Sequence, residues 1–134
     1  MVSKQVIVMR KDLNMRKGKM VAQGSHASMK AILNRMNMHP TEEHGIHEMT
    51  LYLEDGTALM DWLEGSFTKI CVSVDSEEEL LDIYQKAKSA GLITALITDA
   101  GLTEFGGVPT HTCCAIGPNW DTDINPITGN LKLL

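Results

Sequence analysis

The sequence predicts an α/β protein with three layers, α/β/α, around a four-stranded mixed sheet whose last strand is antiparallel. Short apolar runs alternate with segments of helical periodicity. Strands joined through helices pair in parallel by right-handed crossovers. The last connection, residues 99–109, is too short and too rich in glycine for a helical crossover. The length of 134 residues fits a single domain over residues 1–134.

Four strands are predicted, at residues 4–9, 68–74, 92–98 and 110–116. The first is mostly apolar and is expected to be buried on both faces of the sheet. A helix over residues 19–35 follows it after a basic loop. A second helix over residues 76–90 begins with Ser76 and Glu79, which form a capping box, and ends before Gly91.

The remaining segments give weaker signals. Residues 34–56 are polar and irregular, with a short alternating strand expected at 49–54 and one or two helical turns at 58–63. The run His44-Gly-Ile-His47-Glu48 lacks the spacing of known zinc motifs, so we interpret it as a solvated loop and expect no metal site. Cys71, Cys113 and Cys114 are interpreted as small buried apolar residues.

Charge is unevenly distributed along the chain. The net charge is −5, yet residues 1–35 hold eight basic residues and one acid, a balance of +7, and the remainder a balance of −12. A local basic surface can bind phosphates on an acidic protein, although charge alone favours the alternative of a solvated charge cluster. No apolar run reaches the roughly 18 residues of a membrane span and no signal peptide is recognised, so a cytoplasmic protein is expected.

Two segments carry candidate chemistry. Lys19, Gln23, His26 and Lys30 fall within about 60° of one another on the first helix, which forms a narrow polar stripe on a body expected to be mostly buried. Asp99 directly follows the third core strand, where a carboxylate can orient a water molecule. An ordinary solvent face and a loop-capping aspartate are the alternative interpretations. Nucleotide-binding glycine motifs and the GxSxG elbow are absent.

Several short segments, taken in order and spacing, resemble the second family of peptidyl-tRNA hydrolases, the archaeal and eukaryotic type. They are Val6–Met9 with Arg10-Lys-Asp-Leu-Asn-Met15, Gly18-Lys-Met-Val-Ala-Gln-Gly-Ser-His-Ala27, Asp99-Ala-Gly-Leu-Thr103, Thr110-His-Thr112, Ala115-Ile-Gly-Pro118 and Ile127-Thr-Gly-Asn-Leu-Lys-Leu133. The resemblance implies hydrolysis of the ester between a peptidyl group and the 3′ ribose of tRNA, without a cofactor. A homodimer is compatible with it but has no support in the residues.

The resemblance also implies site residues. Lys19, Asp99, Thr103 and Thr112 match the polar positions grouped as the active site of this family. As a hypothesis, Asp99 positions or deprotonates water and Lys19 stabilises the oxyanion or the leaving oxygen, with these two roles interchangeable. Expected substrate-binding residues are Arg10, Lys11, Arg16 and Lys17 on the acceptor-stem phosphates, and Gln23, His26 and Lys30 along the helix.

Three departures from the family pattern keep alternatives open. Residues at about 39–56 look like an insertion, Pro109 stands where the family has glycine, and Leu102 replaces a basic residue. A binding module for RNA or protein on the same fold, or a hydrolase of a different ester or amide, would fit these departures.

Overall fold

The computed structural model describes residues 1–134 and contains the predicted mixed sheet. Its strands are β1 (Ser3–Arg10), β4 (Lys69–Val74), β5 (Thr94–Asp99) and β6 (Thr110–Trp120), in the order β4-β1-β6-β5. β1 pairs with β4 in parallel, and β6 is antiparallel to both β1 and β5. The antiparallel last strand is therefore confirmed, and it lies between β1 and β5.

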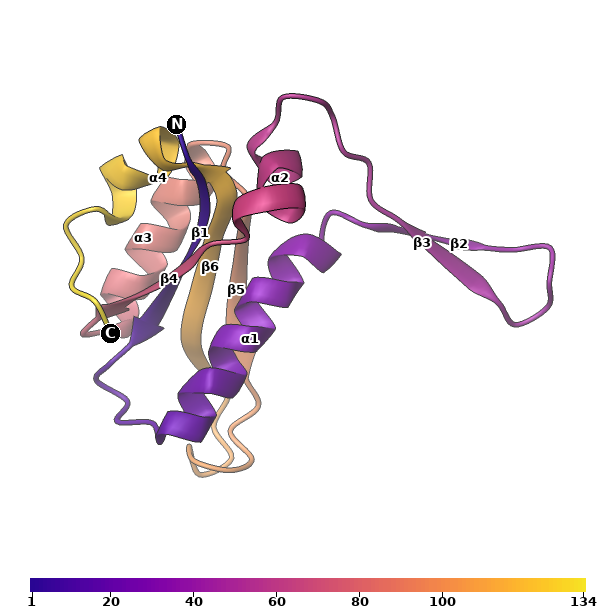
Figure 1. Ribbon diagram of the computed structural model, residues 1–134. Coiled ribbons are helices and arrows are strands. Elements are labelled where there is room, and N and C mark those ends of the chain that lie inside the picture. The colour runs from indigo at the N-terminus through magenta and orange to yellow at the C-terminus, as the bar shows by residue number, and fades with distance from the viewer.

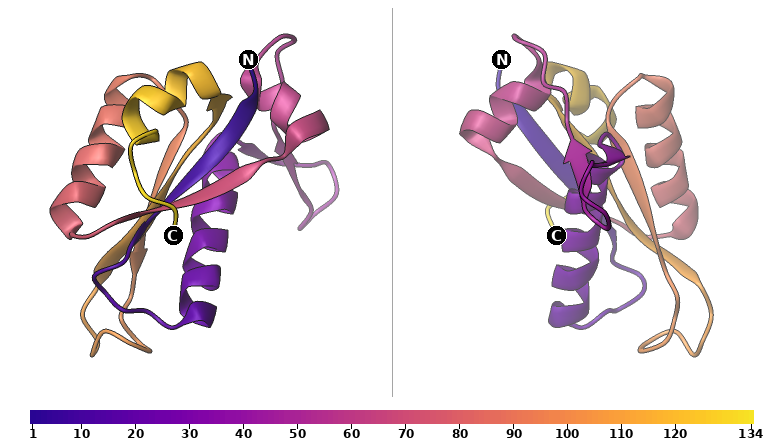
Figure 2. Two further views of the ribbon diagram at one scale, coloured as in Figure 1. Left: turned by 60° about the vertical axis from the view of Figure 1, so that its left-hand side comes forward. Right: turned by 90° about the vertical axis from the view of Figure 1, so that its right-hand side faces the viewer.

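Helices cover both faces of this sheet (Figure 1, Figure 2). On one face lies α1 (Lys17–Leu33), with the short α2 (Ala58–Asp61) and the π-helical turn η1 (Trp62–Ser66) near its end. The other face carries α3 (Glu77–Ser89) and α4 (Asp121–Thr128). The three predicted layers are thus confirmed.

Each face of the sheet has its own core. Ile7 and Met9 pack toward α1, whereas Val6 and Val8 pack toward α3, as the two-residue period of a strand requires. Cys113 and Cys114 likewise belong to opposite cores, and both are buried. β1 is buried along nearly its whole length, as expected for a strand with neighbours on both sides.

The predicted helix caps are found at α3. Ser76 Oγ accepts a hydrogen bond from the Glu79 backbone N–H at 3.0 Å, which satisfies one free donor of the first turn. The Glu79 carboxylate accepts a hydrogen bond from the backbone N–H of Asp75, one residue before the capping serine. Gly91 follows the helix with a positive φ of 76°.

Two expectations about burial are wrong. Cys71 is exposed, because β4 is an edge strand and α1 packs over β1, β5 and β6 instead. For the same reason α1 is less buried than predicted, with Val21 and Met29 more than half exposed. The tail forms helix α4, in which Asp121 and Asp123 occupy the favourable N-terminal turn.

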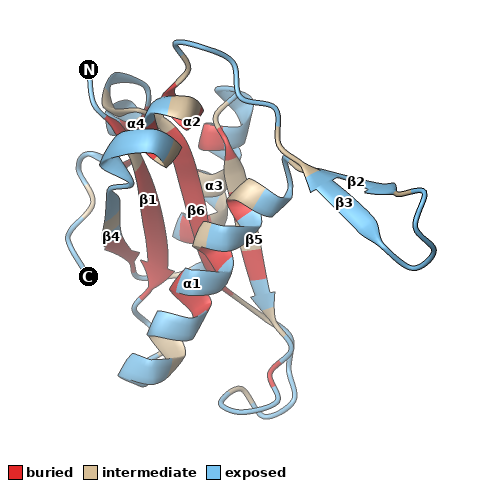
Figure 3. Ribbon diagram, turned by 45° about the vertical axis from the view of Figure 1, so that its right-hand side comes forward, coloured by how far each residue is buried: buried red, intermediate tan, exposed pale blue.

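Residues 37–50 form a two-stranded hairpin, β2 (Asn37–Pro40) paired with β3 (His47–Thr50). This hairpin projects away from the sheet and its helices (Figure 1, Figure 3). The predicted strand at 49–54 therefore begins and ends earlier, and its partner β2 was not predicted. That the segment is an insertion relative to the family stays a prediction.

Candidate active site

Two loops meet at the carboxyl ends of the parallel strands, the edge where open α/β sheets bind ligands (Figure 1). One joins β1 to α1 and contains residues 11–16. The other joins β5 to β6 and contains residues 100–109. An ion pair between Arg16 and Glu104, at 3.9 Å, links them. This edge is where the predicted polar residues converge.

Lys19 and Asp99 form the centre of the site. The Lys19 Nζ lies 2.8 Å from Asp99 Oδ1 and 2.8 Å from Thr103 Oγ1. Both charged side chains are 14% exposed, so the pair is shielded but reachable from solvent. The unfavourable lysine in the first turn of α1 is thereby compensated by a carboxylate from a residue 80 positions away.

The Asp99 carboxylate is held by three donors. Besides Lys19, the Gln23 side-chain amide donates to Oδ1 at 3.2 Å and the Gly101 backbone N–H donates to Oδ2 at 2.8 Å. The Lys19 hydrogen bond is the largest of the causes that hold the pKa of Asp99 below the ordinary value of 3.8, against the opposing effect of burial. Asp99 is therefore ionised at neutral pH.

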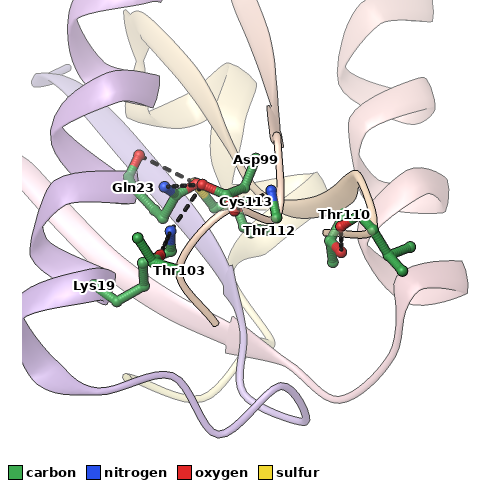
Figure 4. A network of polar contacts seen from close by, with 9 residues as sticks. Lys19, Gln23, Asp99, Thr103, Thr110, Thr112 and Cys113 are labelled. Carbon is green, nitrogen blue, oxygen red and sulfur yellow. Dashed lines mark hydrogen bonds and ion pairs between the residues drawn. The ribbon is translucent and has the colours of Figure 1, made fainter. Parts of the chain in front are cut away.

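A buried relay supports Gln23 from behind (Figure 4). The Thr112 hydroxyl donates to Gln23 Oε1 at 2.6 Å, and this bond fixes the amide so that its NH₂ group faces Asp99. Thr112 has no exposed surface and Gln23 only 2%. Both predicted site residues thus lie behind the open part of the site, out of direct reach of a substrate.

Two neighbours of the site were not predicted. Phe105, in the β5–β6 loop, lies with its ring centroid 5.6 Å from the Lys19 Nζ. Cys113 donates from Sγ to the backbone carbonyl of Gln23 at 3.3 Å, and burial raises its pKa to about 12, so this thiol stays protonated and is no nucleophile. Neither contact could be predicted from the sequence, because Phe105 stands in a glycine-rich loop and Cys113 in a strand, and no local pattern marks either residue as a neighbour of the site.

Gly101 shapes the loop that carries Thr103. Its φ is +81°, in the left-handed region that favours glycine, and a Cβ at this position would overlap the backbone of Val108 across the loop. The backbones at Gly101 and Val108 therefore lie close together, and the chain turns sharply directly after Asp99. It also directs the Gly101 N–H at the carboxylate.

The predicted phosphate ligands differ in availability. Lys11, Arg16 and Lys17 are exposed around the start of α1, and the Arg16 side chain is 92% exposed. Arg10, in contrast, is 9% exposed and makes a paired contact with the Asp12 carboxylate as well as a bond to the His111 carbonyl. Arg10 therefore anchors the loop to the sheet, and its expected place in a phosphate-binding surface is not supported.

The remaining two stripe residues are accessible. His26 and Lys30 are exposed on α1, on the side that also presents Lys19. The start of α1 has neither an acidic residue nor a side-chain cap, so its first backbone N–H groups are open to an anion.

A shielded amine, a carboxylate and two hydroxyl-bearing residues thus lie together at the carboxyl ends of the parallel strands of a small α/β protein, an arrangement suited to hydrolysis. No helix of the structure is both long enough and apolar enough to cross a bilayer.

The comparisons with known proteins agree with this class. The family model described as peptidyl-tRNA hydrolase PTH2 matches residues 3–134. The peptidyl-tRNA hydrolases of Methanocaldococcus jannaschii and Methanothermobacter thermautotrophicus are each 44% identical over 131 residues, which is 98% of this chain and 99% of theirs. That of Halobacterium salinarum is 41% identical over 97% of this chain and 98% of its own. The chain belongs to the peptidyl-tRNA hydrolase PTH2 family.

Proposed function

We propose that this protein hydrolyses the ester bond between a peptidyl group and the 3′ ribose of tRNA, releasing the peptide and free tRNA. Family membership supports the reaction, and the 2.8 Å contact between the Lys19 ammonium and the Asp99 carboxylate is the observation that carries the site assignment. In this reaction water adds to the ester carbonyl, the bond to the ribose oxygen breaks, and a water proton goes to that oxygen.

Asp99 orients the attacking water. An ionised carboxylate has about four acceptor positions, and donors from Lys19, Gln23 and Gly101 occupy three of them. The position left on Oδ2 is available to a water molecule. Because the pKa of Asp99 is lowered, its role is to align the water and to stabilise positive charge on it as the bond to carbon forms.

Lys19 stabilises the negative charge that develops on the substrate. An ammonium group has three N–H donors, and Asp99 and Thr103 accept two of them. The third is free for the carbonyl oxyanion or the leaving ribose oxygen. Thr103 holds the ammonium in this direction, and the buried Thr112 and Gln23 act as positioning residues for Asp99.

The basic start of α1 binds the phosphates near the acceptor end of tRNA. Lys11, Arg16 and Lys17 are exposed there, next to open helix N–H groups, and His26 and Lys30 extend the surface along α1. Replacing Lys11 and Lys17 by alanine should weaken tRNA binding for all tRNA species. The slope of log affinity against log salt should fall by about two, and an unchanged slope would exclude these contacts.

One comparison of substrates tests the proposed reaction against the alternatives. The purified protein is incubated with peptidyl-tRNA, with aminoacyl-tRNA that lacks the peptide, and with a small ester. Rapid release of tRNA from peptidyl-tRNA is expected. Cleavage of the small ester alone would indicate a different hydrolase, and binding without cleavage of any substrate would indicate a module that only binds RNA.

We also propose that the chain acts in the cytoplasm, where a tRNA substrate of translation occurs, and that it forms a homodimer. The exposed surfaces of α1 and of the hairpin support the dimer, because both present apolar side chains that nothing in the single chain covers.

A further inference from the structure

One edge of the sheet leads directly into the candidate active site. β5 stands last in the sheet order and pairs with β6 alone, so its other side is a free edge (Figure 3). The last residue of β5 is Asp99, whose carboxylate accepts the Lys19 hydrogen bond at 2.8 Å. A chain segment that lies along this edge therefore ends at the Lys19–Asp99 pair.

The hydrogen bonds to β6 identify the backbone groups of β5 that face outward. The Gly117 N–H donates to the carbonyl of Ile93, the residue before β5, at 2.8 Å. Hydrogen-bonded positions alternate along an antiparallel pair, so Ala95 also bonds to β6. Thr94 and Leu96 consequently direct their N–H and C=O groups away from β6. None of these four backbone groups has a hydrogen-bond partner in the chain.

The opposite edge of the sheet, at β4, is closed. There the Ser73 N–H donates to the Lys132 carbonyl at 2.8 Å, and the Leu134 N–H donates to the Cys71 carbonyl at 3.1 Å, so the C-terminal tail occupies the outer side of the strand. Proteins commonly block a free edge with charged residues or proline, because such an edge pairs readily with another chain. Residues 94–98 of β5 contain neither, which leaves this edge able to accept an extended chain.

An extended peptide can use this edge whatever its sequence. Peptidyl groups share only their backbone, and main-chain hydrogen bonds to a sheet edge bind the backbone of any sequence. Pairing with β6 is regular from Thr94 to the bulge after Ile97. Because β5 has six residues, Thr94 lies about 17 Å from Asp99, a distance that about five peptide residues span. A single aminoacyl group is too short to reach along this edge.

We propose that the peptide of peptidyl-tRNA binds as an added strand along the free edge of β5. The N–H and C=O groups of Thr94 and Leu96 bond to the peptide backbone, and the esterified end of the peptide lies at Asp99. The peptide runs parallel to β5, because β5 runs toward the site and the peptide is esterified at its carboxyl end. This subsite rests on the proposed hydrolysis of peptidyl-tRNA and assigns the part of the protein that binds the peptide.

The length of the peptide tests the subsite. The full chain is assayed with N-acetylalanyl-tRNA and with the same tRNA carrying an N-acetylated peptide of several alanines. With five alanines, kcat/KM should rise at least about tenfold, which corresponds to about 1.4 kcal/mol and to the net contribution of one or two hydrogen bonds. The gain should level off beyond about six residues, where β5 ends.

Methylation of single peptide nitrogens tests the strand geometry and requires no variant of the protein. Alternate N–H groups of a strand face its neighbour. Methyl groups at successive positions of the five-residue peptide should therefore alternate between a loss of at least about threefold in kcat/KM and little change. Binding of the peptide in another conformation gives no two-residue period.

Thr94→Pro tests the protein side of the contact. Proline at the first residue of an edge strand removes an outward N–H without breaking the pairing to β6, and it obstructs an added strand. The ratio of kcat/KM for five alanines to that for one alanine should fall at least about threefold. The matched control, Thr94→Val, keeps the N–H and should keep this ratio within about twofold of the unsubstituted protein. Thermal melting of both variants verifies folding.

The outcomes separate this subsite from the reaction itself. Equal kcat/KM for one and five alanines, or a length effect without the two-residue alternation, would overturn the subsite and leave the hydrolysis intact. A length effect that a folded Thr94→Pro variant retains in full would overturn it as well. Failure to cleave any of these peptidyl-tRNAs would contradict the proposed function, and the subsite with it.

Discussion

Replacing Lys19 by methionine tests the proposed chemistry most directly. Methionine keeps the length and the apolar stem of the side chain and removes the ammonium, with its 2.8 Å bonds to Asp99 and Thr103. Loss of one donor to a developing oxyanion costs about 10²–10³ in rate, or about 2.7–4 kcal/mol. We therefore expect kcat/KM for peptidyl-tRNA to fall by about that factor.

The cost in stability should be much smaller. With both side chains 14% exposed, the pair lies between a surface ion pair, worth about 0–1 kcal/mol, and a buried one, whose disruption costs about 3–5 kcal/mol. Asp99 also keeps its bonds from Gln23 and Gly101. We expect a loss of about 1–2 kcal/mol in the free energy of unfolding, which leaves the protein folded at 25 °C.

The assay measures tRNA released from peptidyl-tRNA under single-turnover and steady-state conditions, alongside thermal melting. The control is Lys88→Met, an exposed lysine on α3 across the sheet, which should retain full activity. Activity of the Lys19 variant within about threefold of the unsubstituted enzyme would refute the role of the ammonium, since removal of an oxyanion donor typically costs about 10²–10³ in rate. Loss of activity together with unfolding would show a structural role only.

Three further predictions follow from the site. Thr112→Val leaves the buried side-chain oxygen of Gln23 without its hydrogen-bond donor, and should lower the free energy of unfolding, measured in denaturant, by about 1–3 kcal/mol. The variant should also have a lower kcat with little change in KM. A kcat equal to that of the unsubstituted enzyme would show that Thr112 does not position Asp99 through Gln23. In Gly101→Ala, the new Cβ would overlap the Val108 backbone, so the β5–β6 loop that carries Thr103 should be displaced. Because a small misplacement of a catalytic group is costly, kcat should fall at least about tenfold. A crystal structure of the variant with this loop unmoved would contradict the prediction. Because the folded pKa of Asp99 is below 3.8, the stability it contributes is present above that value and is lost as pH falls through the lower folded pKa. The difference in unfolding free energy between the unsubstituted protein and Asp99→Asn should then be constant from about pH 5 to 7 and narrow only below about pH 4; narrowing near pH 6 would contradict the lowered pKa.

Much of the architecture follows from local patterns in the sequence. The apolar run of β1 and the capping box at Ser76 depend on neighbouring residues only, so both were predicted correctly. The antiparallel course of β6 followed from the length of one loop. The amine and the carboxylate could be singled out because each stands at the junction of a strand or helix with a loop.

The tertiary structure decided what is buried, and therefore what each polar residue does. Thr112 and Gln23 became a hidden relay because α1 packs on β6. Arg10 became a loop anchor because the Asp12 carboxylate and the His111 carbonyl accept its hydrogen bonds. Cys71 is exposed because its strand lies at the sheet edge beyond α1. The order of residues along the chain specifies helices, strands and turns through local periodicity. The burial of a residue depends on which distant segments pack against it, and no local sequence pattern encodes that packing.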